Sequence, residues 1–190
     1  FVIRRTSIVD YPKFRHRGFL LDPTSRHYFP IESITKTLDA MSYSKMNVFH
    51  WHIIGDQSFP YQSSAFPNLS ERGAFGKSAI YTKDDVKRVI EHAKLRGICV
   101  IPEFDTPGHS LSWALGGIPG LLTECSDPNQ FGPIDPTVGE NYDFIRTLFS
   151  EVSELFQDNY LHLGGDEVDN SCWSRIQVRL GLKEGRELFK

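Results

Sequence analysis

The chain has 190 residues, 39% of them hydrophobic and 24% charged, which is typical of a globular domain large enough to form its own core. A formal net charge of −3 gives no basic surface for nucleic acid, and no apolar run approaches the roughly 20 residues that a membrane span needs. Three cysteines without a C-x-x-C spacing are too few for a small disulfide scaffold.

The first half of the chain alternates strand and helix patterns. A strand is predicted over residues 15–22, which close on an Asp-Pro turn, and apolar residues at helical spacing predict a helix over residues 31–43. A second strand over residues 47–54 is rich in β-branched and aromatic side chains. The loop that follows, residues 55–79, is longer than a simple connector, so we expect it to have a role such as a flap.

The second half continues the alternation. A helix begins after Thr82, whose hydroxyl can cap free N–H groups, and Gly97 is expected to end it. A third strand covers residues 98–104, where Pro102 predicts that the pairing stops nearby. Residues 110–140 are rich in glycine and proline and are predicted to be mostly irregular.

The last predicted elements are a helix over residues 142–156 and a buried strand over residues 160–168 (YLHLGGDEV). Two glycines end this strand in a tight turn that holds two adjacent carboxylates, Asp166 and Glu167. Residues 174–190 form a polar tail that is predicted to be helical.

The resulting βαβαβαβα order predicts a parallel sheet with right-handed helical crossovers. Two architectures fit this order, an open doubly wound sheet and part of a (β/α)8 barrel. No glycine-rich phosphate-binding sequence follows the first strand, which weakens the nucleotide-binding version of the open sheet. A full barrel takes about 250 residues, so four βα units make about half of one.

Polar side chains collect where the predicted strands end. They are Arg26 after the first strand, His50, His52 and Asp56 on and after the second, Glu103, Asp105 and His109 at the end of the third, and Asp166 and Glu167 at the end of the fourth. Each has a plain structural explanation, such as a satisfied interior histidine or a solvated loop charge. In a parallel barrel, however, all of these ends meet at the face that carries the chemistry, so the group as a whole indicates a site.

The adjacent pair Asp166-Glu167 favours one kind of glycoside hydrolysis. Enzymes with two independent carboxylates place them roughly 5–5.5 Å apart when retaining and roughly 6.5–9.5 Å apart when inverting, usually from different strands. Neighbours on one loop suit a substrate-assisted reaction, in which one is the general acid and the other orients a 2-acetamido group whose carbonyl attacks the anomeric carbon. The spacing permits this reaction without proving it.

Four segments resemble the β-N-acetylhexosaminidase family of glycoside hydrolases, and closely its lysosomal α- and β-subunit branch: HRGFLLDPTSRHYFP, NVFHWHIIGDQSFPYQS, EFDTPGHSLSW and HLGGDE. The resemblance implies an α/β fold, a (β/α)8 TIM barrel, of which residues 1–190 would be the N-terminal half as a single domain. It implies a retaining, substrate-assisted hydrolase that removes terminal β-linked N-acetylglucosamine or N-acetylgalactosamine from glycoconjugates. No metal or other cofactor is expected. A subunit of a homo- or heterodimer and a lysosomal or secreted location fit the same family.

The resemblance also implies roles for individual residues. The catalytic residues would be Glu167 as general acid/base, Asp166 as the residue that orients the acetamido group, and His109 as the partner of Glu167. Arg26 would bind hydroxyls of the non-reducing sugar, with Asp105 as a second substrate-binding residue.

Two covalent features are also expected. Cys125 and Cys172 fall where the family branch forms a disulfide, which leaves Cys99 as the free thiol. Asn68 begins an N-glycosylation sequon, Asn-Leu-Ser, which is relevant if the protein is secreted.

Gly55 departs from the family pattern, in which an aspartate directly follows the Trp-His-x-x run and supports the histidine behind the catalytic acid. Here the aspartate comes one residue later, as Asp56. We therefore predict weakened activity unless Asp56 takes that place, and we expect Gly55→Asp to raise turnover. The later family motifs, which supply aromatic walls and further sugar-binding residues, are absent from the sequence.

Two other functions stay open. The His50-x-His52 pair, with acids and histidines at other strand ends, also suits a metal-dependent hydrolase of the amidohydrolase type. A truncated or degenerate chain that binds a glycan, or pairs with a complete subunit without turnover, would carry the same motifs.

Overall fold

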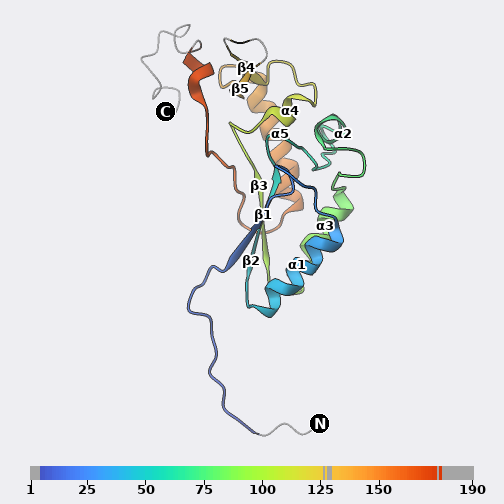
Figure 1. Cartoon of the computed structure of the whole chain (residues 1–190), viewed down its shortest axis with the longest axis vertical. Coiled ribbons are helices and arrows are strands. Elements are labelled where there is room, and N and C mark those ends of the chain that lie inside the picture. Colours follow the sequence, from blue (N-terminus) through green and yellow to red (C-terminus); the bar gives the residue numbers. More distant parts are fainter. Residues whose placement is uncertain (1–4, 126, 128–129, 175, 177–190) are drawn as a thin grey trace.

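The computed structural model describes residues 5–125, 127, 130–174 and 176 (Figure 1). In chain order the elements are β1 (Gly18–Leu21), α1 (Ile31–Tyr43), β2 (Val48–Ile54), α2 (Asn68–Gly73), α3 (Lys83–Lys94), β3 (Cys99–Phe104), α4 (Leu111–Ala114), β4 (Leu122–Glu124), β5 (Phe131–Ile134), α5 (Gly139–Leu155) and the 3₁₀ helix η1 (Asn170–Trp173). The first three predicted strands and the three long predicted helices are confirmed as β1 to β3, α1, α3 and α5. None of the helices in the described part of the chain has the length and apolar character that a membrane span requires.

The strands lie side by side in the order of the sequence. β1, β2 and β3 form a parallel sheet in that order, and His162 forms a parallel bridge with Glu103 beyond β3. The bond from His162 N–H to the Pro102 carbonyl (3.0 Å) and that from Thr106 N–H to the Leu163 carbonyl (2.8 Å) extend this pairing. A doubly wound sheet reverses its strand order at a switch point, whereas consecutive units of a (β/α)8 barrel do not. The barrel prediction is confirmed for the described units.

One face of this sheet is buried under helices. Phe49, Trp51 and Ile53 alternate along β2 and are fully buried. On α1, Ile34 and Leu38 lie four residues apart on the face that is buried. Figure 1 shows α1 and α3 next to each other beside the sheet, so the apolar sides of both helices and the sheet form one core.

The opposite face of the sheet, which faces the interior in a barrel, is more polar. Registered residues of parallel strands share a face, and the register pairs Leu20 with His50, His50 with Ile101, and His52 with Glu103. Leu20 is 49% exposed, whereas Glu103 is buried. The site described below begins on this face.

The start of α3 is confirmed as predicted. Thr82 Oγ1 accepts a hydrogen bond from Asp85 N–H (3.2 Å), and the Asp85 carboxylate accepts one from Thr82 N–H (3.0 Å). This reciprocal capping box satisfies N–H groups that the first helical turn leaves free. Gly97, with φ of +66°, takes the left-handed conformation that follows the end of the helix.

The pairing ends near Pro102, as predicted, but Pro102 itself lies within the ladder. The β2–β3 register runs on through Pro102 and Glu103 to Phe104, with an irregularity between His52 and Ile54. The Pro102 carbonyl accepts a hydrogen bond from the fourth segment, and the N and carbonyl of one strand residue point the same way. The missing N–H therefore falls on the side of the fourth segment and leaves the ladder to β2 intact.

Residues 110–140 contain more regular structure than predicted. They hold α4 and an antiparallel hairpin of β4 and β5, in which Leu122 pairs with Ile134 and Glu124 with Phe131. Elements of three or four residues are too short to show a periodic pattern, so the sequence alone did not reveal them.

The loop of residues 55–79 is fastened rather than open. It contains α2, and the carboxylate of Glu151 on α5 accepts hydrogen bonds from the backbone N–H of Ser64 (3.0 Å) and of Ala65 (3.0 Å). The hydroxyls of Tyr61 and Ser63 donate to the same carboxylate at 3.0 and 3.1 Å. A single carboxylate thus ties the loop to the helix, which does not suit a freely moving flap.

The fourth predicted strand, residues 160–168, differs from the prediction. It pairs with β3 at one bridge only, and Tyr160 and Leu163 are 66% and 47% exposed rather than buried. Among the described residues, none pairs with the other edge of this segment, whereas a strand in a closed barrel is paired on both edges. Most of the tail, residues 175 and 177–190, lies outside the described residues, and the helix predicted there is not tested.

Candidate active site

The turn that carries Asp166 and Glu167 is held by β3. Gly165 N–H donates to Asp105 Oδ1 at 3.1 Å. Gly164 has φ of +68°, and a Cβ at this position would lie 1.7 Å from the same oxygen. Only glycine fits here, because both the backbone conformation and the close approach of Asp105 exclude a side chain. The Gly-Gly pair is therefore part of how the two carboxylates are placed.

A line of three side chains runs from the interior to the surface. His109 Nδ1 lies 2.6 Å from Asp105 Oδ2, and its Nε2 lies 3.4 Å from Glu167 Oε2. Asp166 Oδ1 is 4.0 Å from His109 Nδ1. The side chain of Asp105 is fully buried, whereas that of Glu167 is 80% exposed. A buried carboxylate thus fixes the imidazole, and the imidazole faces an accessible acid.

The surroundings of His109 favour its charged form. Burial by itself lowers the pKa of this imidazole, but its hydrogen bond to Asp105 and the charges of Asp105, Asp166 and Asp56 outweigh burial and raise the pKa above its ordinary value. The charged form therefore contributes stability below the ordinary pKa of histidine, and this contribution is lost as the pH rises through the raised pKa.

Two residues of this line have an unusual backbone. His109 has φ of +47° and Glu167 has φ of +48°. Non-glycine residues in this left-handed region are uncommon, and they gather at functional sites where the surrounding structure enforces the conformation. This observation supports a functional role for the pair independently of the charges.

A hollow of about 430 Å³ lies beside this line. We call it the strand-end hollow; its lining includes Asp56, His109, Phe131, Glu167, Asp169 and the disulfide of Cys125 with Cys172. The β4–β5 hairpin contributes Leu122 and Phe131 to the lining. The lining thus combines carboxylates with apolar side chains, a mixture that suits a sugar ring.

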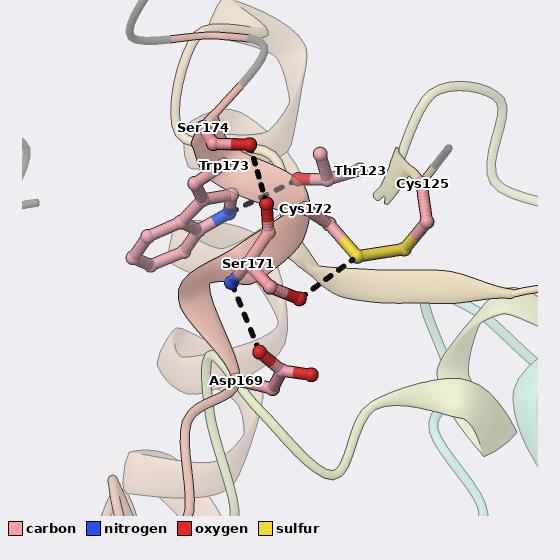
Figure 2. Close-up of a disulfide and its surroundings, with 7 residues drawn as sticks. All are labelled: Thr123, Cys125, Asp169, Ser171, Cys172, Trp173 and Ser174. Carbon is pink, nitrogen blue, oxygen red and sulfur yellow. Dashed lines mark hydrogen bonds between the residues drawn. A yellow bond between two sulfur atoms is a disulfide. The ribbon is translucent and has the colours of Figure 1, made fainter. Parts of the chain in front are cut away.

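Figure 2 shows how the end of the acidic segment is fastened to the hairpin. Cys172 in η1 forms the disulfide with Cys125, the pairing that the family resemblance implies. Trp173 Nε1 donates to Thr123 Oγ1 at 3.0 Å, and Asp169 caps η1 by accepting from Ser171 N–H at 2.9 Å. The chain is therefore held on both sides of Asp166 and Glu167, by Asp105 before them and by the disulfide after them.

A second carboxylate, Glu103, sits under three imidazoles on the inner face of the sheet. Glu103 Oε2 lies 2.5 Å from His50 Nε2 and 3.8 Å from His52 Nδ1, and its Oε1 lies 3.2 Å from His162 Nδ1. Burial raises the pKa of Glu103, but the hydrogen bond from His50 and the nearby imidazoles outweigh it, so the pKa falls below its ordinary value. His162 also accepts from Gly164 N–H (3.0 Å), which links this cluster to the acidic turn.

Three groups of side chains have donor atoms close enough to hold a metal ion. They are His50 with Glu103 and His162, His52 with Glu103 and Asp105, and Asp105 with His109 and Asp166. In the first and last groups the carboxylate already has an imidazole partner at 2.5 or 2.6 Å. These carboxylates therefore already have hydrogen-bond partners within the protein.

The structure brings together most of the predicted site residues. Asp166, Glu167 and His109 converge, but Arg26 lies exposed in the loop after β1, and the structure records no hydrogen bond or ion pair from it to another described residue. Asp105 differs from its predicted role in substrate binding. Its side chain is fully buried and both oxygens bind protein groups, so it supports His109 and the turn from behind.

The predicted glycosylation sequon lies on α2, and the predicted free thiol is on β3. Asn68 is exposed at the first residue of α2, while Ser70 of its sequon is buried. Cys99 is the free cysteine.

Gly55 is tightly surrounded. A Cβ at this position would lie 2.4 Å from Thr24 Oγ1 and 3.3 Å from His52 Nε2. Thr24 is fully buried, and Asp22 Oδ1 accepts a hydrogen bond from its hydroxyl at 2.7 Å. His52 Nε2 is buried and has no hydrogen-bond partner among the described residues. An aspartate at position 55 would therefore require Thr24 to move.

Sequence reasoning missed the apolar lining of the strand-end hollow and the support for the acidic turn. Phe131 belongs to a strand of four residues that pattern analysis could not resolve. The dependence of Gly164 on Asp105 joins residues that are far apart in the chain. Only the Gly-Gly pair itself signalled a close backbone approach.

The chain was compared with known proteins. The sequence model of the glycosyl hydrolase family 20 catalytic domain matches residues 14–186. The α subunit of β-hexosaminidase from Rattus norvegicus is 56% identical over 178 residues, 91% of this chain and 33% of the rat protein. The human β subunit is 55% identical over 177 residues, 91% of this chain and 32% of that protein. The chain thus spans about a third of the length of these relatives.

Solved structures give the same result. A chitobiase from Flavobacterium johnsoniae superposes with a TM-score of 0.81 at 31% identity, covering 95% of this chain and 29% of that one. An exo-β-N-acetylglucosaminidase from Vibrio harveyi, solved in complex with N-acetylglucosamine, gives a TM-score of 0.78 at 30% identity and covers 95% of this chain and 33% of its own.

Proposed function

The chain belongs to glycosyl hydrolase family 20, and from this premise we propose that it is the part of a β-N-acetylhexosaminidase that carries the catalytic acid. The substrate class is a terminal, non-reducing β-linked N-acetylglucosamine or N-acetylgalactosamine. Residues 1–190 then correspond to the first four βα units of the catalytic barrel, in a single domain.

The observation that carries this proposal is the line of Asp105, His109 and Glu167 with Asp166 beside it. Glu167 is the exposed end of the line, so it is the group that can reach a glycosidic oxygen and protonate it. Asp166 is 68% exposed on the same turn, where its carboxylate can accept the N–H of a 2-acetamido group. That contact orients the acetamido carbonyl toward the anomeric carbon and stabilises the positive charge that develops in the ring it forms.

The reaction then has two steps. In the first, the acetamido oxygen bonds to the anomeric carbon while the glycosidic bond breaks and Glu167 gives its proton to the leaving oxygen. In the second, the deprotonated Glu167 takes a proton from water, which attacks the anomeric carbon and opens the cyclic intermediate with retention. His109, held by Asp105, faces the carboxylate of Glu167 in both steps and so acts as its positioning partner.

The direct test is release of a chromophore from an aryl N-acetyl-β-glucosaminide. Glu167→Gln should reduce turnover by on the order of 10²–10⁴ where the leaving group needs protonation. Glu154→Gln removes an exposed carboxylate of α5 outside the strand-end hollow and is the matched control. Equal turnover in the Glu167 variant and the parent chain would contradict the assignment of the acid.

A second candidate is a chain that binds the glycan without turning it over. It is supported by Arg26, which is exposed and forms no hydrogen bond or ion pair with the described site residues. Tight binding of an N-acetylglucosamine thiazoline, a mimic of the cyclised intermediate, without hydrolysis of the aryl substrate would favour this candidate.

Further properties follow from the proposed function. We propose sugar binding by Arg26, glycosylation at the exposed Asn68, association as a homo- or heterodimer subunit, and a lysosomal or secreted location. The disulfide of Cys125 with Cys172 is consistent with such a compartment, because disulfides persist in oxidising surroundings.

A further inference from the structure

The space that would hold a side chain at position 55 is taken by Thr24. The hydroxyl of Thr24 would lie 2.4 Å from a Cβ at Gly55, and the bond from that hydroxyl to Asp22 keeps it there. Contacts this short are not made by real Cβ atoms, so Gly55 and Thr24 form a complementary pair. Beyond Thr24, the nearest side chain to a Cβ at position 55 is that of His52, at 3.3 Å, so the carboxylate at the end of β2 that can approach His109 is that of Asp56.

Asp56 is bonded to the turn that follows His109. Its Oδ1 accepts a hydrogen bond from Leu111 N–H at 3.1 Å, and its backbone carbonyl accepts one from Ser112 N–H at 3.0 Å. Ser112 Oγ in turn donates to the Gly55 carbonyl at 2.6 Å. Residues 55 and 56 at the end of β2 thus hold the start of α4, two residues beyond the imidazole.

Asp56 also shares the surroundings of the imidazole. It lines the strand-end hollow together with His109 and Glu167. Its charge is one of those that favour the protonated ring, together with the charges of Asp105 and Asp166. The charged groups that face His109 are therefore Asp56 from the end of β2, Asp105 from the end of β3, and Asp166 and Glu167 from the fourth segment.

We propose that Asp56 is a positioning residue that fixes the turn carrying His109 and supplies a second carboxylate, after that of Asp105, near its ring. The inference rests on the proposed function for its catalytic meaning. Its physical content, the coupling between Asp56 and His109, does not depend on turnover.

The test is the pKa of His109, measured from the ring resonances of the whole 190-residue chain by NMR titration. Asp56→Asn keeps an oxygen that can accept from Leu111 N–H and removes only the charge. We expect it to lower the pKa of His109 by on the order of 0.5 unit, less than Asp105→Asn does. Glu154→Gln, the matched control on α5, should leave the pKa unchanged. An unchanged pKa in Asp56→Asn would overturn the proposal.

The positioning part has its own measurement, hydrogen exchange at the Leu111 amide. Asp56→Ala removes the acceptor and should speed exchange up to about tenfold, while Asp56→Asn should change it little, because an ordinary hydrogen bond contributes on the order of 1 kcal/mol. Equal exchange in the Ala variant and the parent would refute the bond. If turnover is absent while both shifts occur, the proposed function fails and the coupling stands.

Discussion

At the residue scale, the site depends on Asp105, whose two carboxylate oxygens both form hydrogen bonds within the protein. One carboxylate oxygen of Asp105 forms a hydrogen bond with His109 and the other accepts one from Gly165 N–H. Asp105 also lies so close to Gly164 that a side chain at that position would not fit. The turn that carries Asp166 and Glu167 is therefore held by a buried acid from the end of β3. Small changes at these positions are expected to act at a distance from the reacting atoms.

The pair of Gly55 and Thr24 gives a double-mutant prediction. Gly55→Asp alone should lower the free energy of unfolding by about 1–3 kcal/mol, because its Cβ collides with Thr24 Oγ1. In a Thr24→Ala background the same change should cost less, since the hydroxyl is gone and His52 Nε2 gains a nearby carboxylate. Urea unfolding of the four proteins measures the coupling, and strictly additive effects would contradict it.

Turnover of the same proteins revises an expectation drawn from the sequence. Gly55→Asp was expected to raise activity by itself, but the steric contact predicts that any gain appears only with Thr24→Ala. The aryl-glycoside assay of the single and double variants decides between the two.

The free thiol gives a prediction for chemical modification. Burial, the charge of Asp158 and a hydrogen bond to it raise the pKa of Cys99 to about 11, so only about one thiol in a thousand is ionised at pH 8. Alkylation by iodoacetamide should therefore be slow at pH 8 and speed up toward pH 11. Asp158→Asn should lower the pKa and increase the rate at pH 8. Alkylation at pH 8 as fast as that of an unfolded peptide thiol would show that the site is not protected.

At the scale of elements, strand ends and helix caps are set locally, but loops are placed by distant side chains. The capping box of Thr82 and Asp85 lies within four consecutive residues, and the sequence predicted the start of α3. The loop of residues 55–79 instead depends on Glu151, some 90 positions along the chain, whose carboxylate accepts four groups of the loop. Its placement could not be predicted from its own sequence.

Removal of that carboxylate charge should loosen the loop. Glu151→Gln turns one acceptor oxygen into a donor that faces other donors, so we expect a loss of about 1–3 kcal/mol in the free energy of unfolding. Glu154→Gln, an exposed change three residues along the same helix, should change stability by less than about 0.5 kcal/mol. The comparison is made by denaturant unfolding with unchanged m-value. Equal stabilities would mean that solvent replaces the carboxylate without loss.

At the scale of the whole molecule, the described residues form a three-stranded parallel sheet with helices packed on one face, and a separate β4–β5 hairpin. The inner face of this sheet and the fourth segment leave apolar side chains in contact with solvent, among them Leu20, Tyr160, Leu161 and Leu163. In a closed barrel such a face is packed and each strand is paired on both edges. The arrangement agrees with a chain that spans about a third of its relatives.

We therefore predict that the 190-residue chain by itself is marginally stable or self-associates. Unpaired strand edges and exposed apolar faces favour pairing between copies. Light scattering coupled to gel filtration, together with calorimetry, checks this prediction. A monodisperse monomer that melts cooperatively would contradict it.

The sequence by itself predicted the order of the elements, the parallel sheet and the turn that carries Asp166 and Glu167, because periodicity, caps and glycine turns are local signals, while the barrel class came from the resemblance to a family. Only the tertiary structure decided that the buried Asp105 carboxylate binds His109 and Gly165, that Pro102 remains in the ladder, and that an aspartate at position 55 would collide with Thr24. These outcomes depend on contacts between residues of different strands and loops that meet at one end of the sheet. Local sequence patterns do not predict such long-range contacts.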